Sequence, residues 1–155
     1  MKKITPFIWI KENGKDALDF YTTLFADSKV LSITPIEGAP GPAGQFVASF
    51  TLMGEEFMLI QGGDNPMLAA PGPLSLVVPC DTQEEIDKLW AAFSEGGTPN
   101  VCGWITDRFG ITWQVTPTQM GEWMTGEPEK RARVIQAFMQ MSKFDIATLE
   151  AAAKG

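Results

Sequence analysis

The stretch Thr82-Gln83-Glu84-Glu85-Ile86-Asp87-Lys88-Leu89-Trp90-Ala91-Ala92-Phe93 decides the fold. It opens with a capping box, in which Thr82 and Glu85 satisfy each other's free backbone amides. Apolar residues then follow at i, i+3, i+4 and i+7, which predicts an amphipathic helix with one buried face. A helix with the same spacing precedes it by about 69 residues, so that Ala17 aligns with Ile86 and Tyr21 with Trp90. The chain therefore contains two copies of one unit.

Each predicted helix follows an apolar strand and precedes further strands. In the first copy we predict strands over residues 4–10, 29–36, 45–52 and 57–61, and a helix that begins after Asn13, which we expect to be its N-cap. In the second copy we predict strands over residues 74–79, 101–106 and 111–116. The sequence thus predicts an α+β fold of two βαβββ modules with curved, mixed and mainly antiparallel sheets. Because each helix has a single apolar face, we expect it to cover only the convex side of its sheet.

The modules are predicted at residues 1–61 and 74–117, with a Gly- and Pro-rich connector over residues 62–73. Residues 118–155 form a helical tail outside the repeat, with a helix over 127–141 and a shorter helix capped by Asp145. Val134, Phe138 and Met141 give this tail an apolar stripe that must dock on the same chain or on a partner. From the stripe and the connector we predict a homodimer, with or without exchange of modules between the two chains.

Composition excludes several function classes. The 155 residues carry a net charge of −7 and no histidine. An acidic chain is a poor partner for nucleic acid or for an anionic membrane, and the commonest metal ligand and general base is missing. The two cysteines have no CxxC spacing, and the chain runs from Met1 straight into a strand, so we predict a cytoplasmic protein.

The candidate functional residues are aromatic and amide side chains on predicted strands. Trp9, Trp104 and Trp113 either fill the core or line a pocket, and Gln114 either faces solvent or contacts a ligand. Asp64 is either a turn residue or, if it is desolvated, a general base. We predict a pocket walled by five apolar side chains, with Gln114 as its main polar contact: Phe7, Trp9, Met58, Trp104 and Trp113.

Four stretches of the sequence are informative when taken together: Ile4-Thr5-Pro6-Phe7, Gln61-Gly62-Gly63, Cys102-Gly103-Trp104 and Trp113-Gln114-Val115-Thr116-Pro117. They resemble the PhnB-like branch of the vicinal oxygen chelate superfamily, a superfamily that includes glyoxalase I, bleomycin-resistance proteins and extradiol dioxygenases. The resemblance implies two βαβββ modules that enclose a binding cleft. It also places the metal-ligand positions of other members at Pro6 or Phe7, near Gln61, near Ser75 and at Gln114. None of these is an ionisable ligand, so we predict no metal and no cofactor, and count Gln61 and Ser75 among the ligand-binding residues.

Three classes of function remain. The first is a metal-independent small-molecule-binding protein, similar to the bleomycin-resistance members that hold a ligand between aromatic side chains. The second is an enzyme of unknown reaction that uses Asp64, Gln114 or backbone amides, and the third is an interaction module. We favour the first. The branch is often labelled demethylubiquinone-methyltransferase-like, but this sequence has no doubly wound pattern with a Gly-rich turn to hold S-adenosylmethionine.

Overall fold

The computed structural model describes residues 5–36, 42–64, 74–125 and 127–155. The chain forms two compact units, Met1–Gly72 and Pro73–Gly155. Residues 65–73 of the predicted connector lie outside the described residues. Its first residues, Gly62 and Gly63, belong to the first unit, because their N–H groups donate to the carbonyls of Ile10 and Lys11 at 3.1 and 3.0 Å.

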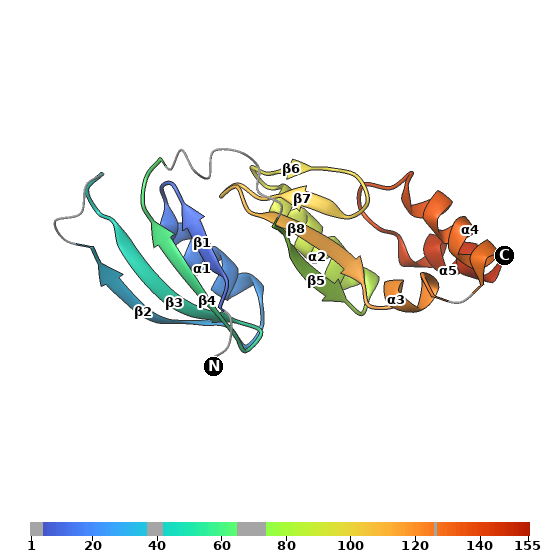
Figure 1. The fold of residues 1–155 in the computed structure, drawn as a ribbon, viewed down its shortest axis with the longest axis horizontal. Helices are drawn as coiled ribbons and strands as arrows, with labels where there is room; N and C mark the ends of the chain where they lie inside the picture. The colour runs from blue at the N-terminus through green and yellow to red at the C-terminus, as the bar shows by residue number, and fades with distance from the viewer. Residues whose placement is uncertain (1–4, 37–41, 65–73, 126) are drawn as a thin grey trace. The chain divides into compact units, whose positions relative to one another are not determined.

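The first unit contains β1 (Phe7–Ile10), α1 (Gly14–Leu24), β2 (Lys29–Pro35), β3 (Phe46–Leu52) and β4 (Glu55–Gln61). The second contains β5 (Leu76–Cys80), α2 (Gln83–Ser94), β6 (Thr98–Pro99), β7 (Trp104–Thr106) and β8 (Thr112–Pro117). The strand orders are β1-β4-β3-β2 and β5-β8-β7-β6 (Figure 1). Only β1–β4 and β5–β8 pair in parallel among the described pairs. The predicted α+β fold of two βαβββ modules is confirmed.

Strand alternation assigns the two faces of the first sheet. Ile8 and Ile10 of β1, Leu59 of β4 and alternate residues of β3 are buried on the side covered by α1. The helix contributes Ala17, Leu18 and Tyr21 to this core, each at most 1% exposed. Period-two burial on the strands and period-3.6 burial on the helix therefore meet in one layer of apolar side chains.

The second sheet is built in the same way. Ile86, Leu89 and Phe93 of α2 pack against a face that carries Val78, Cys80, Ile105, Trp113 and Val115. The predicted capping box is present, since Glu85 N donates to Thr82 Oγ1 at 3.2 Å and Thr82 N donates to Glu85 Oε2 at 3.2 Å. The sequence did not predict β6, because a strand of two residues, the second of them a proline, is too short to show an alternating pattern.

The predicted N-cap position of α1 is confirmed at Asn13, but the Asn13 side chain does not cap the helix. Asn13 occupies the N-cap position but has a positive φ of 58° and makes no capping hydrogen bond with its side chain. The amide of Gln61 takes that role from the end of β4, where its Oε1 accepts from Gly14 N at 2.7 Å. The first N–H of the helix is therefore satisfied by a residue distant in sequence.

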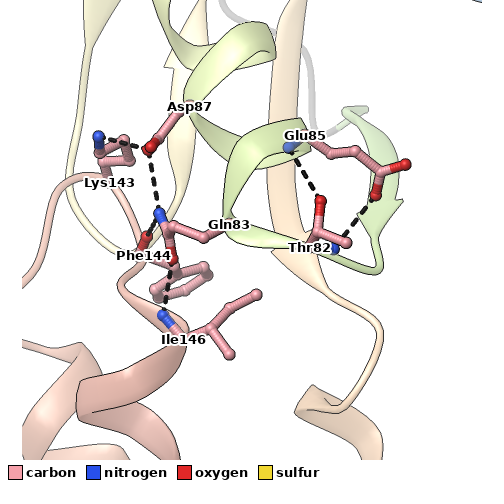
Figure 2. A network of polar contacts seen from close by, with 7 residues as sticks. All are labelled: Thr82, Gln83, Glu85, Asp87, Lys143, Phe144 and Ile146. Atoms are coloured by element: carbon pink, nitrogen blue, oxygen red, sulfur yellow. Dashed lines mark hydrogen bonds and ion pairs between the residues drawn. The ribbon is translucent and has the colours of Figure 1, made fainter.

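The tail docks on its own chain. Its helices are α3 (Met120–Trp123), α4 (Pro128–Phe138) and α5 (Ile146–Lys154), and Asp145 caps α5 through Thr148 N at 2.7 Å. Figure 2 shows Gln83 of α2 at the junction. Its Nε2 donates to the Phe144 carbonyl at 3.0 Å, and its Oε1 accepts from Ile146 N at 2.8 Å.

Two further contacts fix this attachment. Lys143 Nζ lies 2.6 Å from Asp87 Oδ1, and hydrogen bonds from Lys143 and Gln83 lower the pKa of Asp87 below its ordinary value (Figure 2). Gly103 leaves room for the Phe144 ring, which would lie 2.5 Å from a Cβ at that position. The stripe predicted to reach a partner is thus partly used within the unit, because Val134 is fully buried while Phe138 and Met141 are half-buried. No helix in the described part of the chain has the length and apolar character needed to cross a membrane.

Candidate functional site

The face of the first sheet opposite α1 carries three of the predicted pocket residues. Phe7 pairs with Met58, and Trp9 pairs with Ile60, along the parallel β1–β4 ladder. These residues alternate with the buried Ile8, Ile10 and Leu59, so their side chains lie on the other side of the sheet. Phe7 is 50% exposed, and Trp9 and Met58 are half-buried. The structure therefore brings Phe7, Trp9 and Met58 together on what we call the first open face.

Trp9 is held in place by the motif that follows β4. Its indole Nε1 donates to the Gly63 carbonyl at 2.9 Å. A Cβ at Gly62 would lie 2.3 Å from the Trp9 ring, so only glycine permits this approach. Since the indole N–H already has a partner, Trp9 can contact a ligand only through its ring, by stacking or by apolar contact.

Gln61 does not lie on the first open face. It pairs with Ile10 and Phe46, both of which face α1, and its side chain binds the N-terminus of that helix. Its Nε2 also donates to the Gly44 carbonyl at 3.2 Å. The interpretation of Gln61 as a ligand-binding residue gives way to a structural one, because both ends of the amide are engaged in holding the fold.

Asp64 does not meet the condition set for a general base. Its side chain is 81% exposed and forms an ion pair with Lys11 at 2.9 Å. The hydrogen bond to Asp64 raises the pKa of Lys11. A carboxylate in this setting is solvated and paired, whereas a base that works near neutral pH needs desolvation or a like charge nearby.

The open face of the second sheet brings together Trp104, Gln114 and Ser75. Gln114 of β8 pairs with Trp104 of β7 on one side and with Val77 of β5 on the other. Gln114 Nε2 donates to Ser75 Oγ at 2.8 Å, and the amide is half-buried. Trp104 is 39% exposed and Val77 56% exposed. We call this cluster the second open face.

Trp113 is not part of either open face. As the neighbour of Gln114 in one strand it points to the opposite side of the sheet, where it is 3% exposed and stacks on Phe93 at 4.8 Å between ring centroids. Its indole Nε1 donates to Asp107 Oδ2 at 2.8 Å. Trp113 is a core residue, so the predicted pairing of Trp113 and Gln114 in one pocket wall is wrong.

Sequence reasoning missed the role of Asp107. This carboxylate is 4% exposed, and its Oδ1 accepts from Phe109 N at 2.9 Å and from Ile111 N at 3.0 Å. Together with the bond from Trp113 it ties the β7–β8 turn to the core. The sequence Asp107-Arg108-Phe109-Gly110 has the composition of a turn, and Trp113, six residues after Asp107, is the partner that could have indicated a buried carboxylate.

The residues at the predicted metal-ligand positions do not fit a transition metal. Phe7 has no donor atom, Gln61 faces α1, and Ser75 and Gln114 offer one hydroxyl and one amide. Such neutral oxygen donors bind divalent transition metals weakly when no imidazole, thiolate or carboxylate accompanies them. Within the described residues, no group of three or more Cys, Asp or Glu side chains is arranged to hold an ion.

Comparison with known proteins defines the family. The family model described as 3-demethylubiquinone-9 3-methyltransferase matches residues 2–116. A solved structure named as a candidate 3-demethylubiquinone-9 3-methyltransferase, the PhnB protein from Bacillus cereus, is 34% identical to this chain. It covers 76% of this chain and 100% of its own, with a TM-score of 0.68. The chain belongs to this PhnB-like family of the vicinal oxygen chelate superfamily.

More distant structures share the fold. Protein PA1353 from Pseudomonas aeruginosa is 22% identical, with coverage of 76% of this chain and 98% of its own and a TM-score of 0.59. The fosfomycin resistance protein FosX from Listeria monocytogenes is 10% identical, with coverage of 81% and 98% and a TM-score of 0.57. No curated protein sequence matches the chain.

Proposed function

We propose that this chain is a small-molecule-binding protein that works without a metal ion and holds its ligand against the aromatic-bearing open face of a sheet. The observation that carries the proposal is the cluster of Ser75, Trp104 and Gln114 on the second open face. It combines an exposed aromatic ring with a hydrogen-bonding amide whose orientation is fixed by a neighbouring hydroxyl. Sites for small ligands typically combine apolar surface with a few positioned polar groups.

Exposure of these side chains supports the same proposal. Phe7 at 50%, Val77 at 56% and Trp104 at 39% are large apolar residues left accessible on otherwise well-packed sheets. Gathered exposed apolar residues mark interaction sites more often than isolated ones do. The first open face can make aromatic and thioether contacts through Phe7, Trp9 and Met58. The second open face, considered by itself, has the amide of Gln114 as a hydrogen-bonding group.

The donor set supports metal independence. A FosX structure is described as a complex with Mn(II), whereas the positions that the family resemblance assigns to metal ligands are, in this chain, Pro6 or Phe7, Ser75 and Gln114, with Gln61 bonded to the start of α1. The family description names a methyltransferase. The two sheets of this chain each have a single parallel strand pair among the described residues, which argues against the doubly wound sheet that holds S-adenosylmethionine in many methyltransferases. We therefore propose binding rather than methyl transfer.

A thermal-shift screen against metabolites, run with EDTA and again with Mn²⁺ or Zn²⁺, tests the proposal. A ligand that binds the native state raises the melting temperature by mass action. We expect the same rise with and without metal, and a loss of the rise in Trp104→Ala and Gln114→Leu. Gln136→Leu, an exposed glutamine of α4, is the matched control. A rise that requires metal contradicts metal independence, and a rise that survives both variants contradicts the site.

We also propose a cytoplasmic homodimer. The support for self-association is the exposure of Leu31 at 48% and Ile33 at 43% on the edge strand β2, together with the half-buried Phe138 and Met141 of the tail. The support for a reducing compartment is that both cysteines, Cys80 and Cys102, are free. Sedimentation velocity at micromolar concentration tests the dimer, and a species of 16.9 kDa would contradict it.

A further inference from the structure

The second open face carries hydrogen-bonding groups but no charge at any described strand position. Its strand positions are Val77 and Pro79 on β5, Trp104 and Thr106 on β7, and Thr112, Gln114 and Thr116 on β8. Charged residues make up 20% of the chain and give it a net charge of −7. Two ion pairs of the second unit, Lys143 with Asp87 and Arg108 with Glu95, involve residues outside these strand positions.

From this pattern we infer that the ligand of the second open face is an uncharged planar molecule that donates a hydrogen bond to the amide of Gln114. The inference rests on the proposed binding function and names its ligand class. An ionised carboxylate or phosphonate placed against Trp104 and Val77 loses hydration and finds no cation at these positions to replace it. A neutral ligand avoids that cost.

The geometry of Gln114 specifies the hydrogen bond. Gln114 Nε2 already donates to Ser75 Oγ at 2.8 Å, and within the described residues its Oε1 accepts no hydrogen bond. The amide oxygen is therefore available to a ligand that brings an N–H or O–H. Thr106 and Thr112 pair with each other next to Trp104 and Gln114, and their hydroxyls, 3.3 Å apart, form a hydrogen bond with each other. Trp104, beside Gln114 in the register, supplies the aromatic surface on which a planar ring stacks.

Matched pairs of amides and acids test the inference. Benzamide against benzoate, and indole-3-acetamide against indole-3-acetate, keep the ring and exchange a neutral donor for an anion. Binding is measured by ligand-observed NMR at pH 7 and at fixed ionic strength. We expect each amide to bind at least about tenfold more tightly than its acid, because the acid loses hydration without gaining a counter-ion.

Three variants locate the effect. Gln114→Leu is expected to weaken binding of the amides by about tenfold because it removes the hydrogen bond, and Gln136→Leu on α4 is expected to leave their affinity unchanged. Val77→Lys places a cation beside Gln114 and is expected to shift the preference toward the acid by about tenfold. Thermal unfolding of each variant confirms that it is folded.

The outcomes separate this inference from the proposed function. Acids that bind the unmodified chain as tightly as the amides overturn the uncharged ligand class while leaving small-molecule binding intact. An affinity for the amides that is unchanged in Gln114→Leu overturns the assigned hydrogen bond. If no amide binds but the metabolite screen yields another ligand, the inference fails and the proposed function stands. If neither series nor screen yields a ligand, both fail.

Discussion

Substitution of Asp107 by asparagine is expected to destabilise the second unit by about 3 kcal/mol. The buried carboxylate accepts three hydrogen bonds, from Phe109 N, Ile111 N and the Trp113 indole. Asparagine keeps one carbonyl oxygen that can accept from the two backbone N–H groups, but these two hydrogen bonds become weaker. A hydrogen bond to a charged acceptor contributes about 1.5–3 kcal/mol, whereas one to a neutral acceptor contributes about 1 kcal/mol. It also turns an NH₂ group toward the indole N–H, so that two donors face each other in the core.

A double-mutant cycle isolates that last effect. Trp113→Phe removes the indole N–H, so Asp107→Asn combined with Trp113→Phe no longer opposes two donors. We expect the double variant to be more stable than the sum of the two single losses predicts, with a coupling of about 1–2 kcal/mol. Urea unfolding followed by circular dichroism gives the free energies, and the exposed Asp81→Asn is the control, expected within about 0.5 kcal/mol of the parent chain. Additive losses, or a loss below about 0.5 kcal/mol for Asp107→Asn, would refute the reasoning.

Three further predictions follow from the contacts. Gln61→Met is expected to cost about 1–3 kcal/mol in urea unfolding, because it leaves the buried Gly14 N–H without its partner; unchanged stability would contradict the capping role. Burial raises the pKa of the Cys80 thiol to about 11, which lowers the fraction of reactive thiolate at pH 8. Iodoacetamide should therefore alkylate Cys80 about 100-fold more slowly in the folded than in the unfolded chain, and equal rates would contradict this. The pKa of Asp87 is lowered in the folded chain, so its contact with Lys143 stabilises the fold at pH values above the ordinary pKa of 3.8, and this stabilisation is lost as the pH falls through the pKa of the folded chain. Lys143→Met should raise the pKa of Asp87 in an NMR titration, and an unchanged pKa would exclude Lys143 as a cause.

Periodicity predicted the elements of this fold well because it is a local property. Helical spacing predicted α1 and α2, and the capping box of Thr82 and Glu85 is where the pattern placed it. Tertiary contacts could not be read in this way. Nothing near Asn13 indicates that Gln61, from another strand, satisfies the start of α1.

The error at Trp113 has a different cause. Successive residues of a strand point to opposite faces, so Trp113 and Gln114 were never able to line one surface. Strand parity was in the sequence and indicated the inward face, since Thr112, Gln114 and Thr116 of one parity are polar whereas Trp113, Val115 and Pro117 of the other are apolar. The structure settles it through Asp107, whose buried carboxylate fixes the indole on the side of α2.

Comparison of the two copies gives the repeat a functional meaning. The helices align at an offset of 69, but the buried strand residues Ile8 and Ile10 correspond to Val78 and Cys80, an offset of 70. Because one residue of shift exchanges the faces of a strand, the structural alignment pairs Phe7 with Val77.

Across the parallel ladder, the residue beside Phe7 is Met58 and the residue beside Val77 is Gln114. The next position carries Ile60 in the first copy and Thr116 in the second, opposite Trp9 and Pro79. Along the parallel strand pair, the same scaffold therefore presents apolar side chains from β4 in the first copy and hydrogen-bonding side chains from β8 in the second. Both copies bury equivalent apolar residues on the helix side, so their difference lies on the faces that folding leaves free, which is where divergence after duplication changes binding without changing the fold.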